Sequence, residues 1–318
     1  MGRADRSADH RIAGRTAGRD GNCELSRTVG SLWRHWRDEL TRSGGQTAAL
    51  DAKLLTAYAL GLSTLEMATC EQRPVSEADV GKVAALLQRR LTGESVARII
   101  GEREFYGLPF RLNAATLEPR PETELLVDMA LDVLPPDGRL LDLGTGTGCI
   151  PIAILANQPD AIAVAIDLSA EALKAAQENG VRNSVAERLN LLQGSWFEPL
   201  SFTMRADEKS CFDLIVSNPP YITSAVVEAL SPEVRDFDPR LALDGGPDGL
   251  GPYRIIATQA AQHLKSGGHV LLEIGYDQGA AVSALLTRAG FADVSVYQDL
   301  NGLDRVVGAH HVKQSERT

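Results

Sequence analysis

The sequence predicts an α/β fold in which a small all-helical domain and a β-hairpin precede a larger domain of alternating strands and helices. Helical periodicity dominates the first third of the chain, from Val29 to about residue 91. A short apolar strand, a glycine-rich loop and an apolar helical segment then follow one another over residues 139–156. Strand-like and helix-like runs alternate beyond that point, which is typical of an α/β domain.

The composition is that of a globular chain. It has 318 residues, of which 44% are apolar and 23% are charged, enough for one large or two medium domains. No apolar run approaches the length of a membrane span. A net charge of −10 argues against the phosphate backbone of nucleic acid as the main partner. The cysteines are far apart, with neither a Cys-x-x-Cys motif nor the spacing of a metal site, which indicates a reduced, cytoplasmic compartment: Cys23, Cys70, Cys149 and Cys211.

The N-terminal segment, residues 1–27, carries arginines interrupted by acidic residues and has almost no large apolar side chain. Such a segment cannot bury a core. Its acidic residues argue against an organellar presequence, and its lack of an apolar stretch argues against a secretory signal. We expect either a disordered leader or a start codon placed too early.

Residues 28–100 are predicted to form a helical domain. Its first helix has one apolar face, made of Val29, Leu32, Trp33, Trp36 and Leu40, and ends at Gly44-Gly45. A second helix is expected over residues 47–60, and a short one after Ser63. Ser76 is the expected cap of the last long helix, whose inward side chains are predicted to be Val80, Val83, Ala84, Leu87 and Leu91. Such a domain suits recognition or packing better than chemistry.

Residues 101–119 contain two short β-like runs around Gly107-Leu108-Pro109, which predict a hairpin between the two domains. The next residues, Arg120-Pro121-Glu122-Thr123-Glu124, lead into a predicted helix over residues 125–134. Proline and acids are ordinary in a first helical turn, so this segment alone indicates no function.

Three glycines spaced two apart, Gly144, Gly146 and Gly148, separate a strand from a helix. Glycine permits positive φ and lets a ligand lie against bare main chain, while the N–H groups at the start of the helix point toward it. The spacing is not a dinucleotide-binding fingerprint, because Cys149 follows Gly148. It resembles motif I of the class I S-adenosylmethionine (SAM) methyltransferases, although a glycine-rich turn can also be purely structural.

A second strand, over residues 161–166, ends at Asp167 and precedes a predicted helix over residues 170–179. An acid at this place faces the same crevice as the glycine loop, where its carboxylate can accept hydrogen bonds from a ribose diol. The alternative is that Asp167 caps the following helix. After a third strand at residues 190–193, the indole of Trp196 is expected either against an adenine or at the edge of the core.

The most informative motif, Asn218-Pro219-Pro220-Tyr221, follows a buried strand over residues 212–217. The prolines stiffen the loop and fix the direction of the Pro219 carbonyl. A planar NH₂ group is a poor nucleophile because its lone pair is delocalised. If the Asn218 oxygen and the Pro219 carbonyl each accept one N–H, the nitrogen is oriented and its developing charge is stabilised, while Tyr221 packs on the flat amide or base. The alternative is a proline-rich turn without a role.

The remaining segments complete a domain over residues 120–310. Residues 230–252 are predicted to be a long polar loop that either closes over a substrate or is only a surface excursion. Strands are expected over residues 269–274, 294–297 and 305–308, with a helix over residues 280–289. Glu273 ends its strand on the crevice side and receives no assigned role. Residues 311–318 are expected to be a tail.

Several segments occur in the same order in the release factor glutamine N5-methyltransferases (PrmC/HemK), and the resemblance covers roughly residues 30–310. They are Glu104-Phe105-Tyr106-Gly107, residues 119–124, the glycine loop, and residues 217–222, 239–250, 272–279 and 299–307. The DNA and RNA N-methyltransferases share only the glycine loop and the Asn-Pro-Pro-Tyr motif, so the flanking segments make the resemblance specific.

The resemblance implies a Rossmann-like domain with a seven-stranded sheet. It implies methylation of the glutamine side-chain amide in the Gly-Gly-Gln tripeptide of class I peptide chain release factors. The residues implied to hold SAM are Gly144, Thr145, Gly146, Thr147, Gly148, Asp167, Trp196 and Asn218. The residues implied to bind the glutamine are Asn218, Pro219, Pro220 and Tyr221, with Asn218, Pro219 and Tyr221 catalytic. The family commonly has an acid where this chain has Ser195, so the contact to the adenine amino group is expected to be weaker or to come from the backbone.

Two other classes stay open. A nucleic-acid adenine N6-methyltransferase would use the same Asn218 chemistry, but it should show a basic face or a DNA-reading module. A non-catalytic SAM-binding scaffold would have no need of an intact Asn-Pro-Pro-Tyr motif. We therefore expect a monomeric, cytoplasmic enzyme that uses SAM and acts on class I release factors, with no metal, no membrane and no direct nucleic-acid partner.

Overall fold

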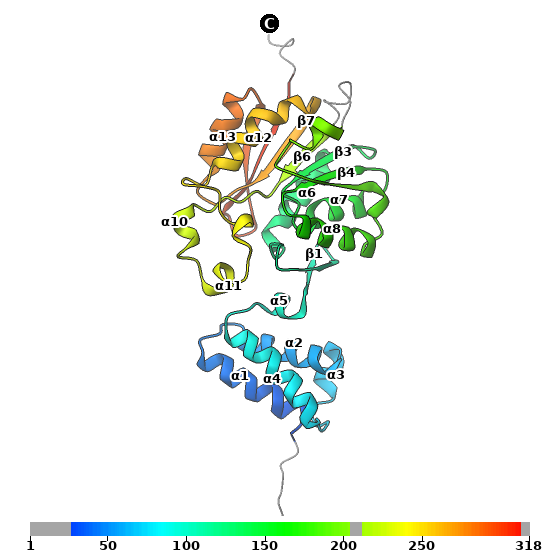
Figure 1. The fold of residues 1–318 in the computed structure, drawn as a ribbon, viewed down its shortest axis with the longest axis vertical. Helices are drawn as coiled ribbons and strands as arrows, with labels where there is room; N and C mark the ends of the chain where they lie inside the picture. The colour runs from blue at the N-terminus through cyan, green and yellow to red at the C-terminus, as the bar shows by residue number, and fades with distance from the viewer. Residues whose placement is uncertain (1–26, 204–211, 313–318) are drawn as a thin grey trace, which may run out of the picture.

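The computed structural model describes residues 27–203 and 212–312, which form a helical domain and a larger α/β domain (Figure 1). The expected leader and tail lie almost wholly outside these ranges. The helical domain occupies one end of the molecule, and the short helix α5 (Val96–Ile100) lies between it and the α/β domain. Within the described ranges, no helix is both long and apolar enough to cross a membrane.

The helical domain consists of α1 (Val29–Arg42), α2 (Ala48–Leu60), α3 (Thr64–Thr69) and α4 (Glu77–Leu91). The Ser76 hydroxyl accepts a hydrogen bond from the Asp79 amide and caps α4, as the sequence predicts. Leu87 is fully buried with the apolar face of α1, but the expectation for Leu91 is wrong, because 39% of it is exposed. Leu91 is the last residue of α4 and lies one turn past Leu87, beyond the packed core.

The expected hairpin is present as β1 (Glu102–Phe105) and β2 (Leu108–Arg111). Its turn is Tyr106-Gly107, slightly earlier in the chain than the turn at Gly107-Leu108-Pro109 that the sequence predicts. Tyr106 and Gly107 have φ values of 54° and 72°, the left-handed values of a two-residue type I′ turn. Pro109 lies within β2, where a two-stranded sheet leaves one side of each strand unpaired and therefore tolerates a missing N–H.

The α/β domain is built on a seven-stranded sheet with the order β5-β4-β3-β6-β7-β9-β8, which confirms the architecture implied by the resemblance. Its parallel strands are β3 (Arg139–Leu143), β4 (Ile162–Asp167), β5 (Leu189–Gln193), β6 (Phe212–Ser217) and β7 (Leu264–Glu273). The last strand, β9 (Asp304–His310), is antiparallel to both β7 and β8 (Ala292–Gln298). The strand order reverses at β3, and such a switch point opens a crevice at the carboxyl ends of the strands.

Helices cover both faces of this sheet (Figure 1). One face carries α6 (Glu124–Val133), α7 (Cys149–Asn157) and α8 (Ala170–Arg182), and the other carries α12 (Gly251–Gln259) and α13 (Gly279–Arg288). Leu140 packs into the core under the first group and Leu141 into the core under the second, because successive strand residues point to opposite faces. Both faces of β3 are therefore buried. Short elements complete the domain: α9 (Leu200–Thr203) and 3₁₀ turns at Ala186–Arg188 and Ala260–Gln262.

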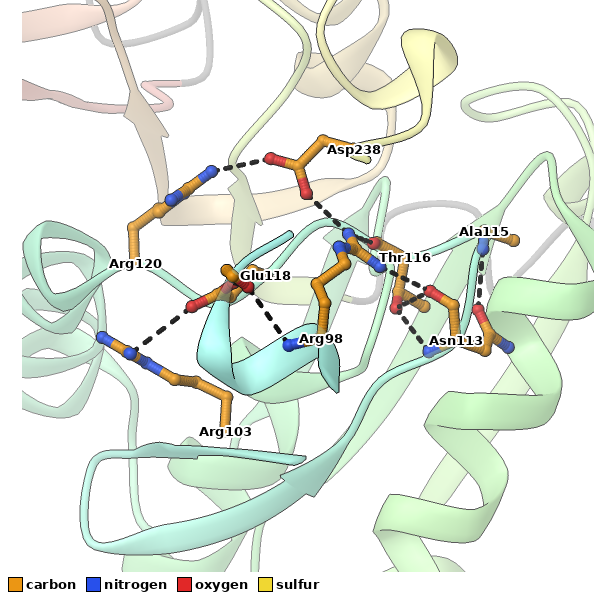
Figure 2. A network of polar contacts seen from close by, with 9 residues as sticks. Arg98, Arg103, Asn113, Ala115, Thr116, Glu118, Arg120 and Asp238 are labelled. Carbon is orange, nitrogen blue, oxygen red and sulfur yellow. Dashed lines mark hydrogen bonds and ion pairs between the residues drawn. The ribbon is translucent and has the colours of Figure 1, made fainter. Parts of the chain in front are cut away.

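A buried ion-pair network joins the two domains (Figure 2). Arg98 on α5 donates to one oxygen of Asp238 at 2.6 Å and to the Asn113 carbonyl at 2.8 Å. Arg120 donates to the other oxygen of Asp238 at 2.7 Å. The Arg98 and Asp238 side chains are only 8% and 4% exposed, so water does not screen this pair. The network fixes α5 against Asn113, just after the hairpin, and against Asp238 of the α/β domain, two residues that are far apart in the sequence.

Candidate active site

A cavity of about 420 Å³ opens at the carboxyl ends of β3, β4 and β6, at the switch point of the sheet. Most of the site residues expected from the sequence line it: Gly144, Thr145, Gly146, Thr147, Asp167, Trp196, Asn218 and Pro220. Ser195 is also part of the lining, whereas Gly148, Pro219 and Tyr221 adjoin it without forming part of it. The fold thus brings together side chains and main chain from four separate strand ends.

The glycines of the loop serve two different structural purposes. Gly144 and Gly146 have φ values of 76° and 54°, and a Cβ atom at either would meet nothing within 4 Å. Bare main chain therefore faces the cavity at these positions. Gly148 also has a positive φ, of 78°, but a Cβ there would lie 2.9 Å from Ile152 and 3.1 Å from Ala176. Gly148 is thus needed for the close packing of α7 on α8.

Asp167 lies at the end of β4 with its carboxylate directed to the glycine loop. One oxygen accepts a hydrogen bond from the Gly146 amide at 2.8 Å, and the other accepts one from the Ser169 amide at 2.8 Å. The cap of α8 is Ser169, whose hydroxyl accepts from the Ala172 amide, so Asp167 is not the cap itself. Burial raises the pKa of Asp167, and the backbone N–H groups partly offset this. Each oxygen retains a lone pair for a further donor in the cavity.

Trp196 has a φ of 49°, a left-handed value that is uncommon for a large side chain. Its ring packs against the core under α12 and α13, and the residue also lines the cavity. The two alternatives drawn from the sequence are therefore compatible, because the same ring lies at the edge of the core and at the wall of the cavity.

The loop after β6 is held from several sides. The Ser217 hydroxyl donates to the Leu143 carbonyl at 2.6 Å, and the side-chain nitrogen of Asn218 donates to the Thr123 hydroxyl at 3.3 Å. The amide of Gln278 donates to the Tyr221 carbonyl at 3.1 Å. Tyr221 is partly buried, and this burial raises the pKa of its hydroxyl to about 12 and keeps it protonated at neutral pH. These contacts tie the loop to the end of β3, to Thr123 and to Gln278.

Two fully buried acids beside the cavity were not recognised as site residues in the sequence. Asp142 on β3 and Glu273 at the end of β7 are 0% and 1% exposed. Burial is the main cause that raises the pKa of each to about 7. Both look like ordinary members of apolar strands in the sequence. The only signal for these two residues in the sequence is a charged side chain within an apolar run. That signal was noted for Glu273, which received no assigned role.

The segment expected as a long polar loop is partly ordered. It contains α11 (Pro232–Arg235) and a 3₁₀ turn at Arg240–Ala242, and α10 (Ser224–Val227) precedes it. Ile222 forms a bridge with Asp244, and a Cβ atom at Gly249 would lie 2.4 Å from the Tyr221 carbonyl oxygen. The cavity is lined in part by this segment, through Leu241, Ala242, Asp244 and Gly245. It is therefore more than a surface excursion.

The sheet order, with β9 inserted antiparallel between β7 and β8, and the bare glycine loop beside a strand-end acid define a class I SAM-dependent methyltransferase. Comparison with known families agrees with this class. The PrmC N-terminal domain family matches residues 31–101, and the methyltransferase small domain family matches residues 121–231.

Similarity to individual proteins is more specific. A release factor glutamine methyltransferase of Agrobacterium fabrum is 43% identical over 277 residues, which make up 85% of this chain and 93% of that protein. One from Cereibacter sphaeroides is 44% identical over 270 residues, 85% of this chain and 94% of that protein. The chain belongs to the release factor glutamine methyltransferase family, as the sequence motifs indicated. A solved structure, the catalytic domain of hMettl16 in complex with MAT2A 3'UTR hairpin 6, has a TM-score of 0.52 at 16% identity and covers 72% of this chain and 83% of that one. That likeness shows the fold alone.

Proposed function

We propose that this protein transfers a methyl group from SAM to N5, the side-chain amide nitrogen, of the glutamine in the Gly-Gly-Gln motif of class I peptide chain release factors. The observation that carries the proposal is the placement of Asn218, which lines the same cavity as the glycine loop. Its nitrogen is engaged by Thr123, so its oxygen remains to accept a hydrogen bond from a substrate amide. The names of the relatives support the same substrate.

The cavity fits SAM, which supplies a methyl group on a positively charged sulfur. We propose that the main chain from Gly144 to Gly148, with Thr145, Gly146 and Thr147 between, holds the cofactor together with Asp167, Trp196 and Asn218. The carboxylate of Asp167 suits a ribose diol, and the ring of Trp196 offers a flat surface for an adenine. Ser195 adds a hydroxyl at the wall where relatives of this class are expected to have an acid.

In the proposed reaction the chain positions the neutral amide and supplies no base, so the proton that the nitrogen must lose once it carries the methyl group passes to water. The Asn218 oxygen and the Pro219 carbonyl each accept one N–H of the glutamine, which fixes the direction of the nitrogen and stabilises the positive charge that develops on it. Pro220 and Tyr221 pack on the plane of the amide. The Tyr221 hydroxyl is not a base in this scheme, because its raised pKa keeps it neutral.

The proposal is tested with radiolabelled SAM and three acceptors. These are a class I release factor, the same factor with Ala in place of the Gly-Gly-Gln glutamine, and duplex DNA. We expect label only in the intact factor, on the peptide that contains the glutamine. Label in DNA would support the adenine N6-methyltransferase alternative. Label in none of the three acceptors would support a non-catalytic SAM-binding scaffold. We further propose that the enzyme is cytoplasmic, monomeric and without a nucleic-acid partner. Light scattering would test whether it is a monomer, and titration with DNA would test whether it binds nucleic acid.

A further inference from the structure

The wall segment, residues 232–245, runs from α11 to the side of the cavity. Its last residues pair with the chain just after the Asn-Pro-Pro-Tyr motif: the Ile222 amide donates to the Leu243 carbonyl at 3.0 Å, and the Gly245 amide donates to the Ile222 carbonyl at 2.8 Å. A Cβ atom at Gly245 would lie only 2.7 Å from the Pro220 carbonyl oxygen, so these two stretches of main chain are in direct contact. This end of the wall segment therefore borders the part of the cavity proposed to receive the glutamine.

The beginning of the wall segment lies against the helical domain, and α11 is on the side of the α/β domain that faces it (Figure 1). A Cβ atom at Gly93, just after α4, would lie 3.7 Å from the Pro232 side chain and 3.8 Å from the Phe237 ring. Arg90 pairs with Glu233 at 3.7 Å, but 48% of the Glu233 side chain is exposed. Ordinary van der Waals contact and an exposed ion pair hold the segment only weakly.

Asp238 is the only buried acid of the wall segment, and it provides a stronger attachment (Figure 2). One carboxylate oxygen accepts from Arg98 at 2.6 Å, and the other accepts from Arg120 at 2.7 Å. Hydrogen bonds between ionised groups are about twice as strong as those between neutral groups. Arg98 belongs to α5, whose Ile99 packs into the core of the helical domain, whereas Arg120 lines the cavity. One carboxylate thus joins the helical domain, the wall segment and a cationic side chain of the cavity.

The part of the cavity proposed to hold SAM is supported without the wall segment. The Gly144 amide donates to the Ile166 carbonyl at 2.8 Å, and the Gly146 amide donates to the Asp167 carboxylate at 2.8 Å. These bonds join the ends of β3 and β4 to each other. A shift of the wall segment should therefore change the fit of the acceptor more than the binding of the cofactor.

We propose that Asp238 is a positioning residue that holds the wall segment and the Arg120 side chain in place beside the Asn-Pro-Pro-Tyr loop, so that the helical domain helps to shape the binding site for the release factor. This inference rests on the proposed function, since it assigns this side of the cavity to the acceptor. Asp238 is not part of the cavity lining, so it acts through these neighbours. Its loss should weaken the binding of the release factor and leave the chemical step, which depends on Asn218, nearly unchanged.

The test measures methylation by the full chain at saturating SAM, with the concentration of a release factor varied, and SAM affinity by calorimetry. Asp238→Asn keeps the size of the side chain, but its NH₂ group cannot accept a hydrogen bond, so at least one of the two arginines loses its acceptor. We expect the KM for the release factor to rise at least about fivefold, with kcat and SAM affinity within about twofold of wild type. A merely structural role would lower the melting temperature without this split between KM and kcat.

Two further variants separate this role from stability. Arg120→Ala removes a partly exposed partner of Asp238 and should hardly change the melting temperature, yet it should raise the same KM at least about threefold. It decides the question even if Asp238→Asn does not fold. Asp213→Asn is the matched control, because Asp213 accepts from the Arg139 amide at 2.8 Å and from Lys265 at 2.7 Å at the opposite end of β6. It should lower the melting temperature and leave the KM within about twofold of wild type.

A KM within about twofold of wild type for Arg120→Ala, or for a folded Asp238→Asn protein, would overturn the inference. An equal loss of SAM affinity, or an equal rise in KM for Asp213→Asn, would overturn it as well. Each of these results would leave the proposed function intact, because the wild-type protein would still methylate the release factor. A wild-type protein that does not methylate the release factor would overturn both.

Discussion

Removal of the Asp238 carboxylate should destabilise the protein by about 3 kcal/mol. Asp238→Ala leaves the buried guanidinium of Arg98 without its anion, and breaking one side of a buried pair costs about 3–5 kcal/mol. Arg98 keeps two carbonyl acceptors, Asn113 and Thr116, which places the cost at the lower end of that range. Arg120 is 39% exposed and can turn to solvent, so its lost pair adds about 0–1 kcal/mol.

The assay is thermal and urea unfolding followed by tryptophan fluorescence. Trp33 and Trp36 report on the helical domain and Trp196 on the α/β domain, so both sides of the network are observed. A loss of about 3 kcal/mol corresponds to a fall in Tm of roughly 6–12 °C for a chain of this size. Arg120→Ala is the matched control and should cost less than about 1 kcal/mol. A loss below about 1 kcal/mol for Asp238→Ala would refute the view that this pair is shielded from water and joins the domains.

Three further predictions concern the cavity. Asp167→Ala should weaken SAM binding by about 1–3 kcal/mol, the cost of leaving hydroxyl donors without a charged acceptor, and calorimetry showing unchanged affinity would remove Asp167 from the site. Gly148→Ala should destabilise the fold by about 1–3 kcal/mol because its Cβ would collide with Ile152 and Ala176, whereas Gly146→Ala should cost only the strain of its positive φ; urea unfolding compares the two. Asp142 has a pKa raised from 3.8 to about 7 in the folded protein, so its contribution to stability is present at low pH and is lost as pH rises to about 7. Asp142→Asn should therefore flatten the fall in Tm between pH 5 and pH 8, and an unchanged slope would show that Asp142 ionises normally.

The elements that carry the site could be predicted from local patterns. Three of these elements can be recognised from the hydrophobic pattern of their own residues: the strand before Gly144, the helix after Gly148 and the strand before Asn218. The same holds for Ser76, whose capping role depends on residues three positions away. These features fix where the loops lie at the ends of the strands, and therefore which residues meet in the cavity.

Features that depend on contacts between distant segments could not be predicted. The Arg98–Asp238 pair joins residues 140 positions apart, and neither residue belongs to a recognisable pattern. Glu273 gains its surroundings from Thr123 and Asn218, which lie on other segments. The exposure of Leu91 likewise depends on where the neighbouring helices end, because its spacing along α4 is the same as that of buried residues.

The most direct test of the account is single-turnover methylation of a release factor by Asn218→Ala at saturating SAM, with SAM affinity measured in parallel. The hydrogen bond that the Asn218 oxygen is proposed to accept strengthens as positive charge develops on the amide nitrogen. Removal of this oxygen should therefore slow the chemical step more than it weakens SAM binding. We expect the rate to fall by on the order of 10²-fold or more, about 3 kcal/mol, with little change in Tm. A folded Asn218→Ala protein with a rate within about threefold of wild type would contradict the account, because the stabilisation lost would then be below about 1 kcal/mol.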